Sequence, residues 1–194
     1  MQLIVSVTAE WLEQNGESMK KKTNKVKSFV EGLHKYLVTH PQFRKKTNGK
    51  SETQIQTEIR PLIIRYLEKH FENAGYKDFV AKANKSFYWE GQEGQYGKAR
   101  PSTFGTRNYP DFIITEPHLI AIEYKKSPNG STVKHGIGQS IMHTLCEEFH
   151  YVYFLFHDES EDKRIWKSVD NEVEGFIIDK IWKEFNVFIR FVEP

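Results

Sequence analysis

The chain has 194 residues, of which 28% are charged, and a formal net charge of +2 at pH 7. This length is consistent with one domain that buries a substantial core. No apolar run approaches the roughly eighteen residues of a membrane span, and the apolar start of the chain lacks the basic segment of a signal peptide. The single cysteine, Cys146, cannot form an internal disulfide, so we expect a reducing cytoplasm and interpret this residue as a small core side chain.

Positive charge is concentrated near the N-terminus. Residues 1–50 contain ten Lys or Arg against four Asp or Glu, whereas the remainder contains eighteen against twenty-two. Clusters of this kind neutralise backbone phosphates of nucleic acid. The candidate phosphate contacts in this region are Lys21, Lys22, Lys45 and Lys46. A solvated helix face followed by a flexible loop explains the same residues, and the sequence leaves both interpretations open.

The first fifty residues are expected to be mainly helical. Residues 8–15 and 24–40 carry apolar side chains three and four positions apart, as in Val26, Phe29 and Val30. Residues 41–50 are polar and basic, which favours a loop. We therefore divide the chain into a basic helical extension, residues 1–50, and a core, residues 51–194, within one compact domain.

A second helix is signalled by Ser51, with Gln54 in the capping-box position. Its apolar face continues to Phe71, and Gly75 supplies the expected end. Pro61 is costly inside a helix, by about 3 kcal/mol, so we expect the regular helix to start near Thr57.

Residues 79–89 alternate between polar and apolar side chains and predict a strand. A glycine-rich segment follows, residues 90–108, with Arg100 and Arg107 as candidate phosphate contacts. Structureless loops of this length are uncommon in compact domains, so the length favours a function such as following a nucleic-acid groove, and a plain connector explains the segment equally well.

Residues 109–126 predict two short strands joined by a turn around Pro117. Successive side chains of a strand point to opposite faces, so Glu123 and Lys125 share one face and Tyr124 takes the other. If the strands pair antiparallel, Asp111 comes beside Glu123 or Lys125. Two carboxylates and an ammonium then lie together at the centre of the predicted sheet.

The last third of the chain predicts four more elements. A helix begins near Gly138, and residues 151–156 form an apolar run suited to a buried strand. Residues 173–185 form an amphipathic helix with Phe176, Ile177, Ile181 and Phe185 on one side, and residues 186–192 form a closing strand.

These motifs resemble the PD-(D/E)XK nuclease superfamily. Pro110-Asp111, eleven intervening residues and then Glu123-Tyr124-Lys125 match its signature, and Gln139 matches a glutamine at the start of its second core helix. Residues 51–157 are also similar to the N-terminal nuclease domain of type I restriction motor subunits. The resemblance implies an α/β fold: a restriction-endonuclease-like α-β-β-β-α-β core, with a mixed central sheet flanked by helices.

The resemblance also implies the site residues. It makes Asp111, Glu123, Lys125 and Gln139 catalytic, and it adds a glutamate from the preceding helix to the metal ligands Asp111 and Glu123. We expect that glutamate to be Glu58, with Glu52 as the second choice, while a surface glutamate near a helix N-terminus is the alternative for Glu58. Oxygen ligands of this kind suit Mg²⁺ or Mn²⁺. Lys134 precedes Gln139 and is a further candidate phosphate contact.

The expected activity is hydrolysis of phosphodiester bonds in double-stranded DNA by a metal-dependent endonuclease of restriction, repair or defence type. A homodimer is expected if both strands are cut. Two alternatives remain: an inactive nuclease-fold module that binds nucleic acid, and an enzyme on the same fold that acts on RNA or on junctions.

Overall fold

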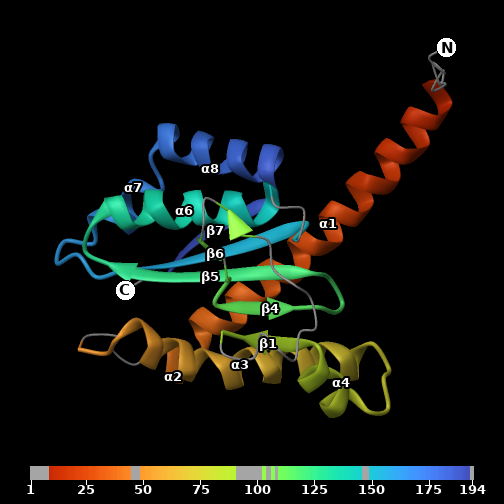
Figure 1. Ribbon diagram of the computed structural model, residues 1–194, viewed down its shortest axis with the longest axis horizontal. Helices are drawn as coiled ribbons and strands as arrows, with labels where there is room; N and C mark the ends of the chain where they lie inside the picture. Colours follow the sequence, from red (N-terminus) through yellow and green to blue (C-terminus); the bar gives the residue numbers. More distant parts are fainter. Residues whose placement is uncertain are drawn as a thin grey trace.

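The computed structural model describes residues 9–44, 49–90, 102–103, 106–107, 109–145 and 149–192. Helices flank a central sheet on both faces (Figure 1), which confirms the α/β class. The helices are α1 (Ala9–Thr39), α2 (Pro41–Arg44), α3 (Glu52–Asn73), α4 (Phe79–Lys85), α6 (Gly130–Leu145), α7 (Arg164–Ser168) and α8 (Glu172–Phe185). The strands are β1 (Phe87–Trp89), β2 (Ser102–Thr103), β3 (Thr106–Arg107), β4 (Phe112–Ile114), β5 (Ile120–Ser127), β6 (Tyr151–Asp158) and β7 (Val187–Val192).

The main sheet contains five strands in the order β1-β4-β5-β6-β7. The pairs β1/β4 and β4/β5 are antiparallel, whereas β5/β6 and β6/β7 are parallel. The sheet is therefore mixed, as expected. Strands β2 and β3 pair with each other in a separate two-stranded ribbon.

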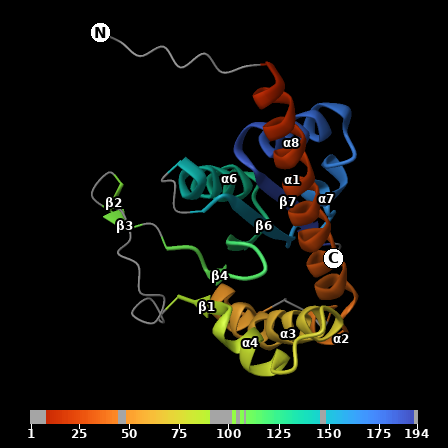
Figure 2. The same ribbon diagram turned by 90° about the vertical axis from the view of Figure 1, so that its right-hand side faces the viewer.

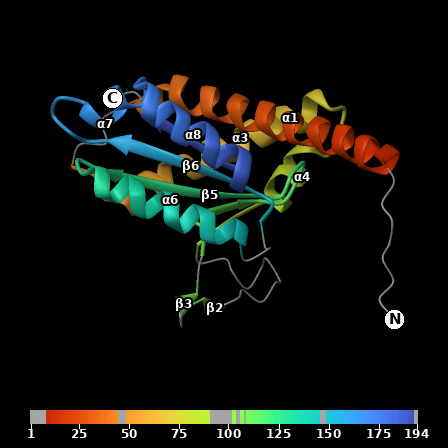
Figure 3. The same cartoon turned by 90° about the horizontal axis from the view of Figure 1, so that it is seen from above.

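Two layers of helices cover the sheet. Ile122 and Tyr124 of β5 pack in one hydrophobic cluster with α1 and α3, and Ala121 packs in a second cluster with residues of α6 and α8. Figures 2 and 3 show β6 between α1 and α6. The alternation of side chains along β5 therefore separates the two halves of the core.

The two helical segments predicted over residues 8–15 and 24–40 are joined in the structure, where residues 9–39 form one continuous helix, α1. Val26, Phe29 and Leu33 are buried in the same cluster as the apolar face of α3. The first part of α1 extends away from the sheet (Figure 1). Residues 41–44, predicted as loop, form the short helix α2.

The predicted start of α3 near Thr57 is wrong. The helix begins at Glu52, and Ser51 and Gln54 form the capping box that the sequence signals. Pro61 lies inside the helix and is exposed. Burial of the neighbouring Leu62 and of the other apolar residues on the inner face offsets the hydrogen bond that the proline removes.

The strand predicted over residues 79–89 is correct only at its end. Residues 79–85 form α4, in which only Ala83 is buried, and β1 occupies residues 87–89. The alternating pattern therefore did not mark one buried and one exposed strand face. Lys82 of α4 forms an ion pair with Glu116 beyond β4, which holds α4 near the hairpin turn.

Helix α6 begins eight residues earlier than the sequence predicts, at Gly130. Gln139 therefore lies in the middle of the helix and not at its start. The predictions for β6, α8 and β7 are confirmed, and all eight residues of β6 are buried. On α8, however, Phe176 is 65% exposed and Ile177 is 46% exposed, so only part of the predicted apolar side packs against the sheet.

Within the described ranges, no helix combines the length and the apolar character that a membrane crossing requires.

Candidate active site

The register of the central hairpin brings two carboxylates together. Phe112 of β4 is the partner of Ile122 of β5, so Asp111 and Glu123 are opposite each other one step farther along the antiparallel pair. The backbone N–H of Tyr124 donates a hydrogen bond of 2.7 Å to Oδ2 of Asp111. Asp111 is therefore fixed at the point where β4 begins and β5 continues past it.

Both carboxylates are buried: Asp111 is 8% exposed and Glu123 is 2% exposed. Burial and the nearby Glu123 raise the pKa of Asp111 to about 8, although Lys125 and the hydrogen bond from Tyr124 act in the opposite direction. Two acids this close cannot both ionise without cost unless a cation lies near them. A cation bound beside Asp111 would therefore lower its pKa and favour loss of its proton.

Lys125 supplies one such charge. Its Nζ is 2.9 Å from Oε1 of Glu123, and the lysine side chain is 17% exposed. Burial alone would lower the pKa of Lys125, but Glu123 and Asp111 raise it above its usual value. Lys125 consequently remains an ammonium that faces the two acids.

The structure places Glu52, the second choice from the sequence, against this group. Oε1 of Glu52 lies 3.4 Å from Nζ of Lys125. Glu58, the first choice, forms an ion pair with Lys50 at 2.7 Å, and its side chain is 46% exposed. Because α3 begins at Glu52 and not near Thr57, its first turn approaches β5, whereas Glu58 lies on a surface away from Lys125.

Helix α6 closes the site from the other side. Residues Gly136, Gln139 and His143 are three and four positions apart, so they share one helix face. Nε2 of His143 lies 3.5 Å from Oε2 of Glu123. A Cβ atom added at Gly136 would lie 3.3 Å from Cγ of Lys125. Helix α6 therefore contacts Glu123 and closely approaches Lys125.

Two oxygens near this face have unused hydrogen-bonding capacity. Oε2 of Glu123 and Oε1 of Gln139 are buried and accept no hydrogen bond from the residues that the structure describes. The contact of Glu123 with His143 is long and does not meet hydrogen-bond geometry, so we treat it as an electrostatic contact only. Buried oxygens without a partner are uncommon and indicate where a cation or a water molecule would be stabilised.

A complete metal site formed by side chains alone is not present in the described part of the chain: no three His, Cys, Asp or Glu residues come close enough to hold an ion. The group offers the two carboxylates Asp111 and Glu123 and nearby backbone carbonyls. Hard oxygen donors with water in the remaining positions are the usual ligands of Mg²⁺. The chemistry of the donors therefore fits a divalent cation that keeps part of its water shell.

The predicted phosphate contacts are only partly described. Lys134 is exposed on α6. The backbones of Lys21 and Lys22 lie in α1 and that of Arg107 lies in β3, but their side chains are outside the description. Arg100, Lys45, Lys46 and the core assignment of Cys146 fall outside the described residues altogether.

His143 is a residue that the sequence interpretation missed. The available signal was its position four residues after Gln139, on the same face of an apolar helix. With a helix start at Gly138, only Gln139 is expected near the site, whereas the helix that starts at Gly130 brings the next turn, with His143, to Glu123 as well.

Comparison with protein-family models, with curated proteins and with solved structures finds no match to this chain. The interpretation of the site therefore depends on its own geometry and chemistry.

Proposed function

We propose that this protein is a divalent-metal-dependent phosphodiesterase that cuts nucleic acid, with double-stranded DNA as the expected substrate. The observation that carries the proposal is the pairing of Asp111 with Glu123, with the ammonium of Lys125 directly beside Glu123. Two neighbouring carboxylates can hold a divalent cation that activates water, and an ammonium beside them can stabilise charge on a phosphodiester.

The order of elements also supports the proposal. Apart from the separate ribbon β2/β3, which lies between β1 and β4 in the chain, helix α3, strands β1, β4 and β5, helix α6 and strand β6 have the order α-β-β-β-α-β of a restriction-endonuclease-like core. Helix α4 is an additional turn between the first helix and the first strand. The mixed sheet, antiparallel before β5 and parallel after it, is consistent with that core.

Asp111 and Glu123 are the residues that would hold Mg²⁺ or Mn²⁺, together with the backbone carbonyl of Tyr124. The buried, unpaired Oε2 of Glu123 is the observation that favours a cation there. A bound metal ion supplies charge neutralisation for a phosphate and a lower pKa for water. It also removes the penalty that raises the pKa of Asp111.

Lys125 contacts two acids, Glu123 and Glu52, and its proposed function is to stabilise a phosphate. Its contacts with Glu123 and Glu52 hold the ammonium at the edge of the site, where it stabilises negative charge that develops on a phosphate. Gln139 presents an amide whose oxygen is free to accept a hydrogen bond from water. Glu52 keeps the lysine extended and is a positioning residue in this scheme.

The expected partner follows from charge. Lys134 is exposed on α6, the helix that contacts Glu123 and Lys125. The sequence of α1 adds further lysines. Cutting both strands of a duplex at one place would favour two such sites, so a homodimer on DNA is part of the proposal. We also propose a cytoplasmic location, because a single cysteine cannot form an internal disulfide and this fits a reducing compartment.

One observation favours a second candidate. Lys125 already neutralises Glu123, and the described residues form no three-ligand metal cluster. A nuclease-fold module that binds nucleic acid without cutting it would need nothing more. The two candidates differ in their response to divalent metal.

The test is a cleavage assay on supercoiled plasmid, a DNA duplex, a branched DNA junction and RNA, with Mg²⁺, Mn²⁺ or EDTA. We expect metal-dependent cutting that falls on the order of 10²- to 10³-fold in Lys125→Ala. The matched control is Lys126→Ala, because Lys126 is the next residue and forms an ion pair with Glu159 at 2.6 Å instead. Cutting by Lys125→Ala at the wild-type rate, or cutting in EDTA, would falsify the mechanism. Binding without cutting would favour the inactive module.

A further inference from the structure

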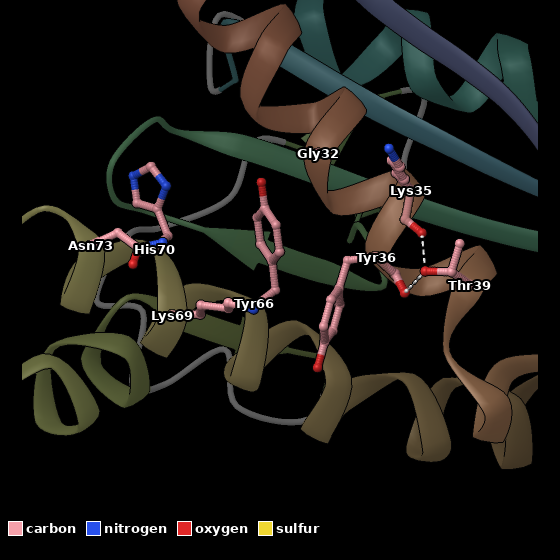
Figure 4. A pocket seen from close by; sticks show the side chains of 8 residues that line it. All are labelled: Gly32, Lys35, Tyr36, Thr39, Tyr66, Lys69, His70 and Asn73. Atoms are coloured by element: carbon pink, nitrogen blue, oxygen red, sulfur yellow. Dashed lines mark hydrogen bonds between the residues drawn. The ribbon is translucent and has the colours of Figure 1, made fainter.

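A cavity lies between α1 and α3, with a volume of about 330 Å³. Residues three, four and seven positions apart on each helix line it (Figure 4). Lys35 and Tyr36 come from α1, and Tyr66, Lys69 and His70 come from α3. A volume of this size is within the range of small-ligand sites in proteins.

The two tyrosines form a fixed aromatic wall. The ring centroids of Tyr36 and Tyr66 are 5.7 Å apart, with an angle of 43° between the rings. The hydroxyl of Tyr66 donates a hydrogen bond of 3.0 Å to the backbone carbonyl of Phe29. A Cβ at Gly32 would lie 2.5 Å from that hydroxyl oxygen, so the glycine makes the close approach of Tyr66 to α1 possible. The wall is therefore formed before any ligand arrives.

The positive charge at the cavity comes from Lys35 and Lys69. Both are exposed, and neither forms an ion pair with any residue that the structure describes. In the part of the chain that the structure describes, no acidic side chain lines the cavity. Burial lowers the pKa of His70, so its ring is neutral at pH 7 and offers a hydrogen bond without charge. The lining therefore pairs an aromatic surface with two free ammonium groups.

We propose that this cavity binds a nucleotide unit, with the base against the tyrosine wall and the phosphate held by Lys35 or by Lys69. Stacking on aromatic side chains tolerates any base, because every base has a π-face, and lysine is a common point charge for phosphate. The unit is either a free nucleotide or one nucleotide of a single strand, since both present the same ring and charge.

The cavity is separate from the proposed catalytic centre. Tyr66 lies fourteen residues after Glu52 in α3, which corresponds to roughly 21 Å along the helix axis. The inference goes beyond the proposed function, and binding at this cavity does not require cleavage.

The experiment measures binding in EDTA, so that metal-dependent cutting does not contribute. Wild-type protein is titrated with adenosine monophosphate and, separately, with a short fluorescent single-stranded oligonucleotide. We expect at least one of them to bind, and its affinity to fall at least tenfold in the double variant Lys35→Ala with Lys69→Ala. The control is Lys85→Ala with Lys167→Ala, which removes the same charge from two exposed lysines on α4 and α7.

The two ligands distinguish the two sources. Binding of the mononucleotide indicates a free-nucleotide site, whereas binding of the oligonucleotide alone indicates a contact for a strand, and either supports the proposal if the control variant binds normally. Tyr36→Leu should also weaken binding, because it removes half of the aromatic wall. The proposal is overturned if neither ligand binds, or if the control variant loses as much affinity as the cavity variant. Its failure is distinguishable from that of the nuclease assignment, which depends only on metal-dependent cutting.

Discussion

Two buried aspartates at the ends of the central strands differ in the hydrogen bonds that their carboxyl groups accept. Asp158, the last residue of β6, is 1% exposed. Its Oδ1 accepts hydrogen bonds from the Ser160 backbone N–H at 2.8 Å and from the Ser160 hydroxyl at 2.6 Å, and its Oδ2 accepts one from the Trp166 N–H at 2.9 Å. Asp111 is 8% exposed and, among the described residues, accepts one such bond, from the N–H of Tyr124.

The pKa values of the two side chains shift in opposite directions. Burial alone would raise the pKa of Asp158, but the hydrogen bonds from Ser160 and Trp166 lower it below the usual value. For Asp111, burial and Glu123 together raise the pKa. A buried acid with a full set of donors stabilises a local structure, here the turn that leads into α7. A buried acid beside another acid, with few donors, is costly in the fold and is typical of a site that binds something.

The largest expected effect comes from replacing each aspartate by asparagine. Asp111→Asn should reduce metal-dependent cleavage on the order of a thousandfold, because the neutral amide loses the attraction of a carboxylate for the cation, which is worth several kcal/mol. Its stability in EDTA should equal or exceed that of the wild type, since the substitution removes one of two neighbouring acids. Cleavage rates and urea unfolding of the same preparations measure both.

Asp158→Asn should show the reverse pattern. Its free energy of unfolding should fall by about 1–3 kcal/mol, because the donors of Ser160 and Trp166 lose a charged acceptor. Its cleavage rate should remain close to that of the wild type at a temperature where the variant is folded. The comparison between the two aspartates is broken if Asp111→Asn unfolds the protein, or if Asp158→Asn removes cleavage without affecting stability.

The two glutamates of α3 sharpen the comparison. Glu52→Gln should reduce cleavage roughly 10- to 100-fold, as expected for a residue that orients a catalytic group, because it releases one partner of Lys125. Glu58→Gln is the matched control, since Glu58 pairs with Lys50 on the surface. Equal losses in the two variants would show that the position of Glu52 beside Lys125 has no functional role.

The last expected effect is a pH dependence of stability without metal. In the unfolded chain the pKa of Asp111 is near the ordinary value of 3.8, whereas in the folded protein its pKa is about 8. The folded state therefore binds more protons in this interval, and the stability that Asp111 contributes falls as the pH rises, by at most about 1.4 kcal/mol per pH unit.

Urea unfolding in EDTA at several values between about pH 5 and pH 8 tests this sign. The difference in unfolding free energy between the wild type and Asp111→Asn should move against the wild type as the pH rises. Parallel curves for the two proteins would show that Asp111 ionises normally in the folded state. Asp158 does not contribute in this range, because its lowered pKa confines its effect to more acidic conditions.

The sequence was sufficient to predict the central hairpin and the faces of β5. Strict alternation around Glu123 and Lys125 fixed which side chains lie together, and the capping residues Ser51 and Gln54 marked the true start of α3. The choice between Glu52 and Glu58 was not predictable, because it depends on whether packing tolerates Pro61 within the helix. A local penalty of about 3 kcal/mol argued against it, and the buried face of the whole helix outweighed that penalty.

Two further differences between the sequence-based predictions and the structure concern α4 and His143. Residues 79–85 have an alternating pattern, yet they form a helix in which only Ala83 is buried. The contact of His143 with Glu123 joins residues twenty positions apart through the packing of α6 on β5. No local pattern specifies which turn of a helix meets a given residue of a strand.

The glycine at position 136 has a consequence for the mobility of Lys125. A Cβ at this position would lie 2.4 Å from Cε2 of Phe154 and 3.3 Å from Cγ of Lys125, so the bare backbone of α6 approaches both side chains closely. The aliphatic stem of the lysine is thus confined between the helix and the sheet. Immobilising a free lysine side chain costs about 2 kcal/mol of rotamer entropy. In this protein that cost is met during folding, so the ammonium is already in place when a phosphate enters.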